Sequence, residues 1–420
     1  MNDNSEDVRE ARDPGMGGRG HSGALEGLRV IDASTVLAGP LVAALLGDFG
    51  ADVIKIEHPQ GDSLRDFGRK KDGKPLWWKV VSRNKRCITL NLKAPRGNAV
   101  FRKLIAGADV LIENFRTGTL ASWGLGPEVL AAINPRLVTV SVTGFGQTGP
   151  YARRPGFGTL AEAFCGFAHV TGEADGPPTL PPIGLADSVA GLYGTFATMF
   201  ALYERDAKGS GRGQRIDLSL YEPLFAMLGA HATIYSELGE IPRRMGNRSE
   251  NSAPRNTYRT RDGRWVAVAA TTPSIVKRVM TLTGGNALAD DARFATAEGR
   301  LRHASEIDAV VAGWIAQHSL SHVLSEFEAV EAAIAPVNDI EQIMRDPQYR
   351  ARGDIIDVPD FDFGTTRMQN AFPFLSRTPG RVKFAGPPKG FHNREIFVDE
   401  LQLSADELGD LEKEGVEITR

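Results

Sequence analysis

Short apolar segments alternate with amphipathic segments through the first two hundred residues, and this alternation constrains the fold more than any other feature. Runs of strand length, rich in Val, Ile and Leu, lie at residues 28–32, 53–56, 87–92, 109–112 and 137–142. Residues 41–49 and 95–105 have the apolar spacing of helices, and Pro95 stands in a first turn, where helices tolerate proline. Strands that alternate with helices favour a parallel sheet covered on both faces. The sequence therefore predicts a doubly wound α/β domain.

A second, smaller domain is expected further along the chain. A long apolar helix is predicted over residues 186–205, and the chain turns polar over 242–254. The Asp-Gly pair at 262–263 lies between two β-rich segments, a pattern typical of a hairpin. Helical segments follow to about residue 327. We therefore expect a small α+β domain over residues 245–335.

Composition excludes several classes of partner. The 420 residues include 49 Lys and Arg against 52 Asp and Glu, a net charge of −3, with no long block of one sign. We therefore expect no general affinity for nucleic acid or for an anionic membrane. The apolar run at 185–203 carries polar residues, and we expect it to be too short and too polar to span a bilayer.

Cysteine usage and the amino terminus bear on the compartment. Cys87 and Cys165 are the only cysteines, too few and too far apart for a disulfide framework or a metal knuckle. They fit a reducing cytoplasm. Residues 1–24 are charged and glycine-rich without an apolar segment, so we expect a disordered tail rather than a signal peptide.

Two short motifs suggest cofactors that the surrounding sequence does not support. Residues 144–149 match GxGxxG after a strand, but Pro150 stands where the helix of a dinucleotide site should begin, so we favour a glycine turn over a NAD site. His318 and His322 have a metal-compatible helical spacing without an acidic third ligand. We favour a solvated helix face there, and expect no metal site.

Asp187 is the acidic residue that the pattern makes most interesting. It stands at the front of the apolar helix predicted over residues 186–205, between Gly184 and Gly191, which permit close approach of a ligand or another backbone segment. The pattern alone favours a helix N-cap, in which the carboxylate accepts backbone N–H bonds. The alternative is a carboxylate kept ionised by the helix N-terminus in an apolar cleft and available as a nucleophile.

An ordered series of motifs carries a family resemblance. The series is LEGLRVID (25–32), AGP (38–40), GDFGADVIKIE (47–57), NKR (84–86), LNLK (90–93), DVLIENF (109–115), NPR (134–136), GFGQTGP (144–150), AD (186–187) and GRGQ (211–214). Over about residues 25–400 the chain resembles the family III CoA-transferases, which include formyl-CoA and carnitine CoA-transferases, and the related α-methylacyl-CoA racemases.

The resemblance implies an architecture and a set of site residues. It implies a large Rossmann-like domain formed by residues 25–235 and, after the small domain, by residues 336–420, and a homodimer of two interlocked ring-shaped protomers. Asp187 falls on the family's catalytic aspartate. The positions that contact coenzyme A map to Val36, Leu37, Ala38, His58, Leu90, Lys93, Asn114 and Phe115.

Departures from the family pattern narrow the expected chemistry. Leu37 stands where many formyl-CoA-type members have Gln, which argues against a formyl/oxalate specificity. Racemases pair the aspartate with a His, where this chain has Phe157 and Gly158, neither of which can carry a proton. The polar stretch 246–254 is the candidate for the family's active-site flap.

The resemblance therefore implies a CoA-transferase that moves CoA from an acyl-CoA donor to a carboxylic acid through aspartyl anhydride and aspartyl-CoA thioester intermediates. Backbone N–H groups at the start of the helix are expected to stabilise the oxyanion. Acyl-CoA is a substrate, and no metal or permanent cofactor is expected. The alternatives are an acyl-CoA racemase or isomerase, a CoA-binding scaffold without catalysis, and a NAD oxidoreductase, which the sequence around the glycine motif disfavours.

Overall fold

The computed structural model describes residues 23–418, which form two compact units. The larger unit comprises the described residues up to Phe167, Leu180–Ala230 and the chain from Pro347 onward, so both ends of the described chain belong to it; the smaller comprises Ala168–Thr179 and His231–Asp346. The disordered tail predicted at 1–24 lies outside the described residues except for its last two.

The segment 168–179 belongs to the smaller unit, whereas the sequence analysis placed it in the larger domain. Hydrogen bonds to the polar stretch that begins at residue 242 account for this. Gly246 N donates to Gly172 O (2.9 Å), and Arg244 Nη1 donates to His169 O (2.8 Å). Such links between distant segments leave no signal in local sequence.

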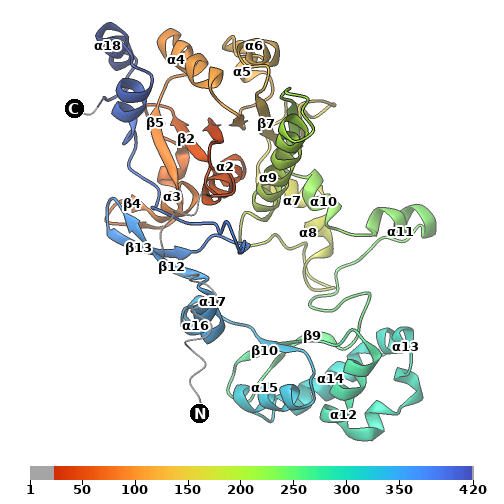
Figure 1. The fold of residues 1–420 in the computed structure, drawn as a ribbon. Helices are drawn as coiled ribbons and strands as arrows, with labels where there is room; N and C mark the ends of the chain where they lie inside the picture. Colours follow the sequence, from red (N-terminus) through yellow and green to blue (C-terminus); the bar gives the residue numbers. More distant parts are fainter. Residues whose placement is uncertain (1–22, 419–420) are drawn as a thin grey trace. The chain divides into compact units, whose positions relative to one another are not determined.

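A six-stranded parallel sheet forms the centre of the larger unit (Figure 1). Its strands, in spatial order, are β5 (Lys85–Thr89), β2 (Asp52–Glu57), β1 (Arg29–Asp32), β6 (Val110–Glu113), β7 (Val138–Thr143) and β8 (Arg215–Ser219). All five neighbouring pairs are parallel. The predicted α/β fold with a parallel sheet is confirmed, and the first five strands lie where the pattern placed them.

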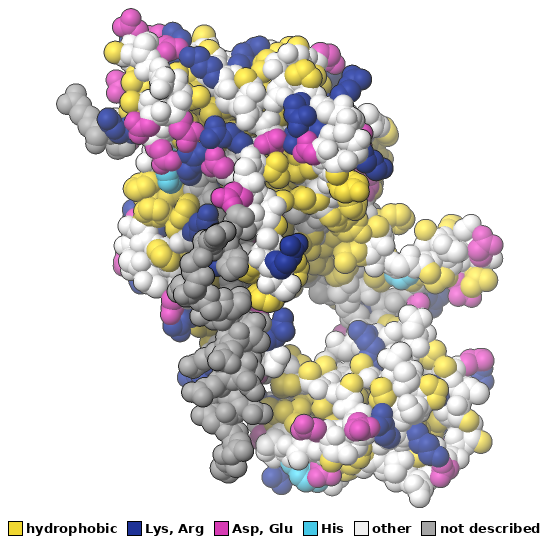
Figure 2. Space-filling model, in the orientation of Figure 1, with side chains coloured by type: hydrophobic (Ala, Val, Ile, Leu, Met, Phe, Trp, Pro, Cys, Tyr) yellow, Lys and Arg dark blue, Asp and Glu magenta, His cyan; other side chains and the backbone are white. Residues whose placement is uncertain are grey.

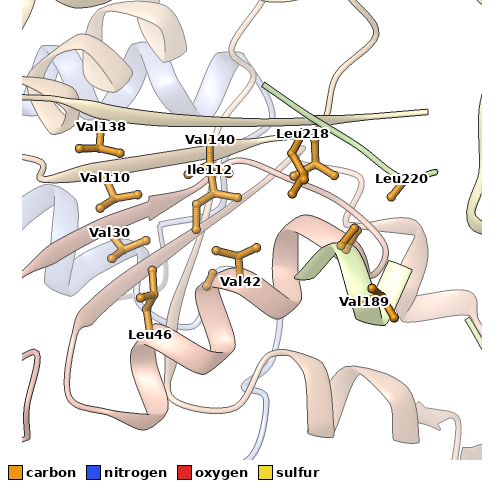
Figure 3. Close-up of a cluster of buried hydrophobic side chains, with 14 of the residues drawn as sticks. Val30, Val42, Leu46, Val110, Ile112, Val138, Val140, Val189, Leu218 and Leu220 are labelled. Atoms are coloured by element: carbon orange, nitrogen blue, oxygen red, sulfur yellow. The ribbon is translucent and has the colours of Figure 1, made fainter. Parts of the chain in front are cut away.

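Helices cover both faces of this sheet. On one face, α2 (Ala38–Asp48) and α9 (Leu185–Asp206) pack against each other and the strands. Figure 3 shows Val30, Val110 and Val138 of three neighbouring strands pointing toward α2. The other face is covered by α4 (Pro95–Ala106), α6 (Pro127–Ile133) and α18 (Ala405–Lys413) around a second apolar cluster. Because successive side chains point to opposite faces, a strand buried on both sides is apolar throughout.

The remaining elements of the larger unit are shorter. They include α3 (Leu76–Val81), α5 (Thr119–Ser122), α7 (Gly158–Phe164), α10 (Glu222–Ala226), α17 (Pro347–Arg352) and two hairpins, β3 (Lys70–Lys71) with β4 (Lys74–Pro75) and β12 (Ile355–Asp360) with β13 (Gly364–Gln369). The sequence analysis predicted neither hairpin. The strands of the second have burial that alternates with exposure, and they lack the continuous apolar character of the sheet strands.

The smaller unit contains a three-stranded antiparallel sheet, β9 (Arg255–Arg259), β10 (Trp265–Ala269) and β11 (Ile334–Pro336), in the order β11-β10-β9. The predicted Asp-Gly turn joins β9 to β10. Its longer helices are α11 (His231–Leu238), α12 (Pro273–Ala289), α14 (Ala304–Ile315) and α15 (Leu320–Ala329), and its short ones include α13 (Ala297–Arg302) and α16 (Ile340–Arg345). Val266, Ile307 and Phe327 are fully buried in its core.

Helix α9 is longer than the sequence analysis expected. Its 22 residues, with mean hydropathy 1.2, are enough by length and composition alone to cross a membrane, so the expectation that this run is too short and too polar was wrong. Core helices of globular proteins pass the same test. Here α9 packs on α2, α7 and α10 and on two sheet strands, and Ala186, Val189 and Ala190 lie in the core. Its apolar character is therefore partly accounted for by packing within the unit.

Candidate functional site

The carboxyl ends of four adjacent strands bring most of the predicted coenzyme A positions to one edge of the sheet. The loop after β1 carries Val36 and Leu37, His58 follows β2, Lys93 follows β5, and Asn114 follows β6. Open α/β sheets bind ligands beyond the carboxyl ends of their strands. The positions that lie far apart in the sequence thus share the edge where a ligand is expected.

Asn114 holds the loop that follows β1. Its Oδ1 accepts from Thr35 N (2.8 Å) and its Nδ2 donates to Thr35 O (2.7 Å), while Val36 N donates to Asp62 Oδ1 (3.3 Å). Val36 has a φ of 66°, which a β-branched residue adopts only under strain. Strain of this kind persists where surrounding contacts enforce it, and it clusters at ligand sites.

A buried ionic cluster lies beneath the same loop. Lys85 Nζ donates to Asp32 Oδ2 (2.9 Å) and to Pro40 O (2.6 Å), and Lys55 Nζ lies 3.1 Å from Asp62 Oδ2. Lys55 also donates to the carbonyl of Ser34. Burial, the largest influence, opposes ionisation of Asp32, but Lys55 and Lys85 hold its pKa below the ordinary value. Charged groups thus fix the backbone on both sides of Val36.

The predicted contact residues differ in what their side chains can offer a ligand. Ala38 and Leu90 are buried in the two apolar clusters, so only their backbones are available, and the amide of Asn114 is engaged by Thr35. Phe115 packs edge-on against Trp123. His58 and Lys93 are exposed, and Lys93 is the cation best suited to a phosphate. Leu37 is half-buried.

Asp187 is the third residue of α9 and does not cap the helix. The residue that precedes the helix is Gly184, and no side chain caps it, so the N-cap interpretation was wrong. The carboxylate is instead enclosed by close backbone and apolar groups. A Cβ on Gly158 would lie 2.0 Å from Asp187 Oδ2, and one on Gly184 would lie 3.4 Å from that oxygen and 2.8 Å from Leu37 Cδ2. Glycines at both positions make room for the carboxylate.

The electrostatic environment of Asp187 makes it more basic than an ordinary aspartate. Burial, and next the charge of Glu162, raise its pKa from 3.8 to about 6. The sequence analysis expected the helix N-terminus to favour the ionised form and so to lower the pKa of Asp187. The pKa is instead raised. At pH 7 most molecules still carry the carboxylate, now poorly solvated and therefore a better nucleophile.

The first N–H groups of α9 already have acceptors. Leu185 N donates to Ile183 O (2.8 Å), and Ala186 N donates to Glu162 Oε1 (3.1 Å). The sequence analysis expected N–H groups at the start of this helix to stabilise an oxyanion. These two groups are not free to do so. The local reason is that the chain bends back at Ile183 while α7 places the Glu162 side chain under the first turn.

The glycine motif at 144–149 forms a turn held by its own chain. Gln147 N donates to both carboxylate oxygens of Asp217 on β8 (3.0 Å each), and a Cβ on Gly144 would lie 2.6 Å from Gly156 Cα. The next helix, α7, begins only at Gly158. A dinucleotide site needs the helix to begin within the motif, so the preference for a glycine turn is supported by this geometry.

The metal and cysteine expectations concern two histidines of the smaller unit and the two cysteines. The His318 and His322 rings lie tilted against each other (ring centroids 4.5 Å apart), and both contact Trp314. Within residues 23–418 no group of three or more His, Cys, Asp or Glu side chains is arranged to hold a metal ion. Both cysteines are buried and unpaired, and burial raises the pKa of the Cys87 thiol.

Asp187 does not line either of two cavities that the described residues form. The larger, about 320 Å³, lies beside Phe115 and is lined by residues of α5, α6 and the strands β6 to β8. The smaller, about 250 Å³, lies in the smaller unit beside the polar stretch 246–254, where Arg248 Nε donates to Asp308 Oδ2 (2.8 Å). Asp187 as a residue is half-buried, at the carboxyl end of the sheet.

The parallel sheet, with candidate ligand-binding residues at its carboxyl end, is typical of α/β enzymes that bind a ligand there. Comparison with known proteins identifies the family. The sequence matches CoA-transferase family III over residues 25–393, and the chain belongs to that family. It is a CoA-transferase, as the resemblance implied, and CoA-transferases take acyl-CoA as substrate.

Relatives agree over nearly the whole chain. The chain is 41% identical over 394 residues to a succinyl-CoA–D-citramalate CoA-transferase of Chloroflexus aurantiacus, covering 93% of this chain and 98% of the relative. It is 42% identical over 397 residues to the β subunit of a succinyl-CoA–L-malate CoA-transferase of the same organism, with the same coverage. A crystal structure of a CAIB/BAIF family protein from Brucella suis superimposes with a TM-score of 0.80, at 34% identity, over 90% of this chain and 99% of that one.

Proposed function

We propose that this CoA-transferase uses Asp187 as a covalent nucleophile and moves CoA from succinyl-CoA to a four- or five-carbon hydroxydicarboxylic acid. The observation that carries the proposal is a single half-buried carboxylate with a pKa near 6, at the edge of the sheet that carries the predicted coenzyme A positions. A carboxylate of raised basicity attacks a thioester better than an ordinary aspartate does.

The proposed reaction exchanges two acyl bonds without hydrolysis. Asp187 attacks the thioester carbonyl of the donor, the C–S bond breaks, and CoA thiolate leaves with the electron pair, which gives an aspartyl anhydride. The thiolate then attacks the aspartyl carbonyl, releases the donor acid and forms an aspartyl-CoA thioester. The acceptor carboxylate runs the same steps in reverse. Anhydride and thioester are both sensitive to water, so exclusion of water is part of the task.

The contact between Gly158 and Asp187 argues against the racemase alternative. Racemisation by two opposed groups needs a second proton carrier near the aspartate. The position that holds His in racemases is here Phe157 or Gly158; Phe157 is exposed and apolar, and Gly158 lies too close to Asp187 for any side chain. Transfer through one carboxylate needs no such partner.

The substrates are inferred from the relatives. Both relatives compared above are named for succinyl-CoA as donor, and their acceptors, D-citramalate and L-malate, are hydroxydicarboxylic acids. In this chain Leu37 supplies an apolar side chain beside Gly184 at the entrance to Asp187, where the formyl-CoA type has an amide. An apolar wall suits the methylene chain of a succinyl group better than a formyl group.

A second copy of the chain is the proposed partner. Leu192, Phe196, Phe200 and Tyr203 follow one another at helical spacing on α9, and each is at least 40% exposed. Figure 2 shows hydrophobic side chains gathered over α9 and α10, whereas charges of both signs are interspersed on the top of the larger unit. An exposed apolar stripe of this size marks an interface in many proteins. We further propose that the dimer acts in the cytoplasm, where the two buried thiols stay reduced.

Trapping of the covalent intermediate tests the mechanism. Wild-type protein incubated with succinyl-CoA and then treated with borohydride or hydroxylamine should carry a modification on the peptide that contains Asp187, detected by mass spectrometry. Asp187→Ala should lose both the modification and exchange of label between succinate and succinyl-CoA. An Asp187→Ala variant that transfers CoA at near the wild-type rate would contradict the mechanism, and deuterium incorporation at Cα without transfer would favour the racemase.

A panel of acceptor acids tests the substrate proposal separately. Malate, citramalate, glutarate, oxalate and formate are assayed with succinyl-CoA as donor. The proposal requires the hydroxydicarboxylic acids to give the highest kcat/KM. A preference for oxalate or formate would contradict it and leave the covalent mechanism intact.

A further inference from the structure

Glu162 is a buried carboxylate beside the proposed nucleophile. Its residue is 1% exposed, on α7, and its Oε1 accepts a hydrogen bond from Ala186 N (3.1 Å) at the start of α9. Among residues 23–418 no Lys, Arg or His forms an ion pair with it. Burial of a carboxylate without a cationic partner is costly.

We propose that Glu162 is a positioning residue that fixes the first turn of α9 and keeps a negative charge beside Asp187, so that covalent capture of the acyl group relieves the repulsion between the two carboxylates. This inference rests on the proposed function of Asp187. It assigns a role to a residue that never touches the reacting carbonyl.

The positioning role follows from the hydrogen bond to Ala186. The first N–H groups of a helix lack partners within the helix, and α9 has no capping side chain at Gly184. Glu162 supplies an acceptor from a different helix, at the residue directly before Asp187. The orientation of the Asp187 backbone is therefore set by α7, which also contributes Gly158 against the carboxylate.

The electrostatic role follows from the balance of charge in the first step. When an Asp187 oxygen forms the anhydride, the electron pair of the broken C–S bond leaves on sulfur, and Asp187 becomes neutral. The like charge of Glu162 destabilises the free carboxylate but not the acylated form. Removing that repulsion favours both acylation of Asp187 and formation of the aspartyl-CoA thioester.

Other charged groups on the elements packed against α9 are engaged elsewhere. Asp48 on α2 is paired with Arg83, Asp217 on β8 accepts from Gln147, and Glu222 on α10 accepts from Ser219. Arg215 lies at the amino end of β8, and β7 carries no charged residue. Glu162 on α7 is the only charged group of the described residues that shifts the pKa of Asp187. The other charged residues of α9 lie in its last turn.

The substitution Glu162→Gln separates the two roles, because the amide oxygen still accepts from Ala186 N while the charge is gone. We expect the acid limb of the kcat/KM profile to move to lower pH by about half a unit or more, and the trapped Asp187 adduct to fall about threefold or more at pH 7. Glu162→Ala should lose the acceptor as well and transfer more slowly still. Glu222→Gln, on the exposed start of α10, removes one carboxylate from the same unit and should leave the profile unchanged.

A measurement without turnover distinguishes failure of this inference from failure of the proposed mechanism. Wild type, Asp187→Asn, Glu162→Gln and the double variant form a double-mutant cycle. The free energy of unfolding of each protein is measured from about pH 4 to pH 8. Asp187→Asn should stabilise the wild-type background more than the Glu162→Gln background at high pH. Equal effects in both backgrounds, or an unmoved acid limb in Glu162→Gln, would overturn the inference. Absence of any Asp187 adduct in the wild type would instead overturn the proposed mechanism.

Discussion

Gly158 and Asp187 are in such close contact that a single added carbon would not fit: a Cβ on Gly158 would lie 2.0 Å from Asp187 Oδ2 and 2.9 Å from its Cγ. The contact joins the first residue of α7 to the first turn of α9. It fixes where the carboxylate can lie, and it excludes any side chain at position 158 that could share a proton with it.

The variant Gly158→Ala should therefore lose transfer activity. The methyl group must displace the Asp187 carboxylate, and a shift of about 1 Å in a reacting group costs on the order of a hundredfold in rate. We expect kcat to fall by about that factor with the far-ultraviolet circular dichroism unchanged. Gly409→Ala, in open space on α18, is the matched control and should keep full activity. An active Gly158→Ala enzyme would mean that the carboxylate position is not critical.

Asp187→Asn should stabilise the protein at neutral and higher pH. The folded-state pKa of about 6 lies above the ordinary 3.8, so the folded state binds the proton more tightly, and ionisation destabilises the fold as pH rises from about 4 through 6. Asn cannot ionise. The gain in free energy of unfolding should reach at most about 3 kcal/mol near pH 8 and vanish below about pH 4. Urea unfolding of both proteins at the two pH values measures it, and a pH-independent difference would contradict the raised pKa.

Asn114→Ala should weaken binding of acyl-CoA more than it slows the chemical step. It removes the two hydrogen bonds to the Thr35 backbone and releases the strained backbone at Val36, at a cost of about 1 kcal/mol per bond. We expect KM for succinyl-CoA to rise about tenfold with a smaller change in kcat. Asn134→Ala removes comparable hydrogen bonds, to Ile105 O, to Ala108 O and from Arg136 N, before the amino end of β7. It should lower stability without changing KM; a rise in KM for both variants would point to general loosening.

Phe200→Glu should disrupt the proposed dimer. Phe200 is 67% exposed on α9, and a charge in the centre of an apolar interface is strongly unfavourable. Sedimentation at several protein concentrations should show a dimer for the wild type and a monomer for the variant. Lys208→Glu, just beyond the end of α9, serves as a charge-changing control. A monomeric wild type would contradict the dimer.

Sequence alone located much of the fold because its signals are local. Five strands of the sheet, helices α2, α4 and α9 and the β9–β10 hairpin lie where apolar spacing and turn residues placed them. The hairpin of β12 and β13 was not predicted, because its burial alternates with exposure and its pairing is recognised only when both strands are seen.

Asp187 was recognised in the sequence, but its chemical character was not. The pattern favoured an N-cap with a stabilised charge, and the position of the helix start excludes that role. Burial and the charge of Glu162, 25 residues earlier in the chain, raise its pKa. Nothing in the local pattern of residues 158–164 indicates that Glu162 reaches the start of α9.

The sequence by itself determined the order of the first five sheet strands and the family, and it singled out Asp187 as a candidate, because each depends on residue types at fixed spacing along one chain. Only the tertiary structure decided that Asn114 secures the loop of Val36, that Gly158 admits no side chain, and that Glu162 binds the first turn of α9. These relationships are distances between segments brought together by packing, and charge and close contact act through space rather than along the chain.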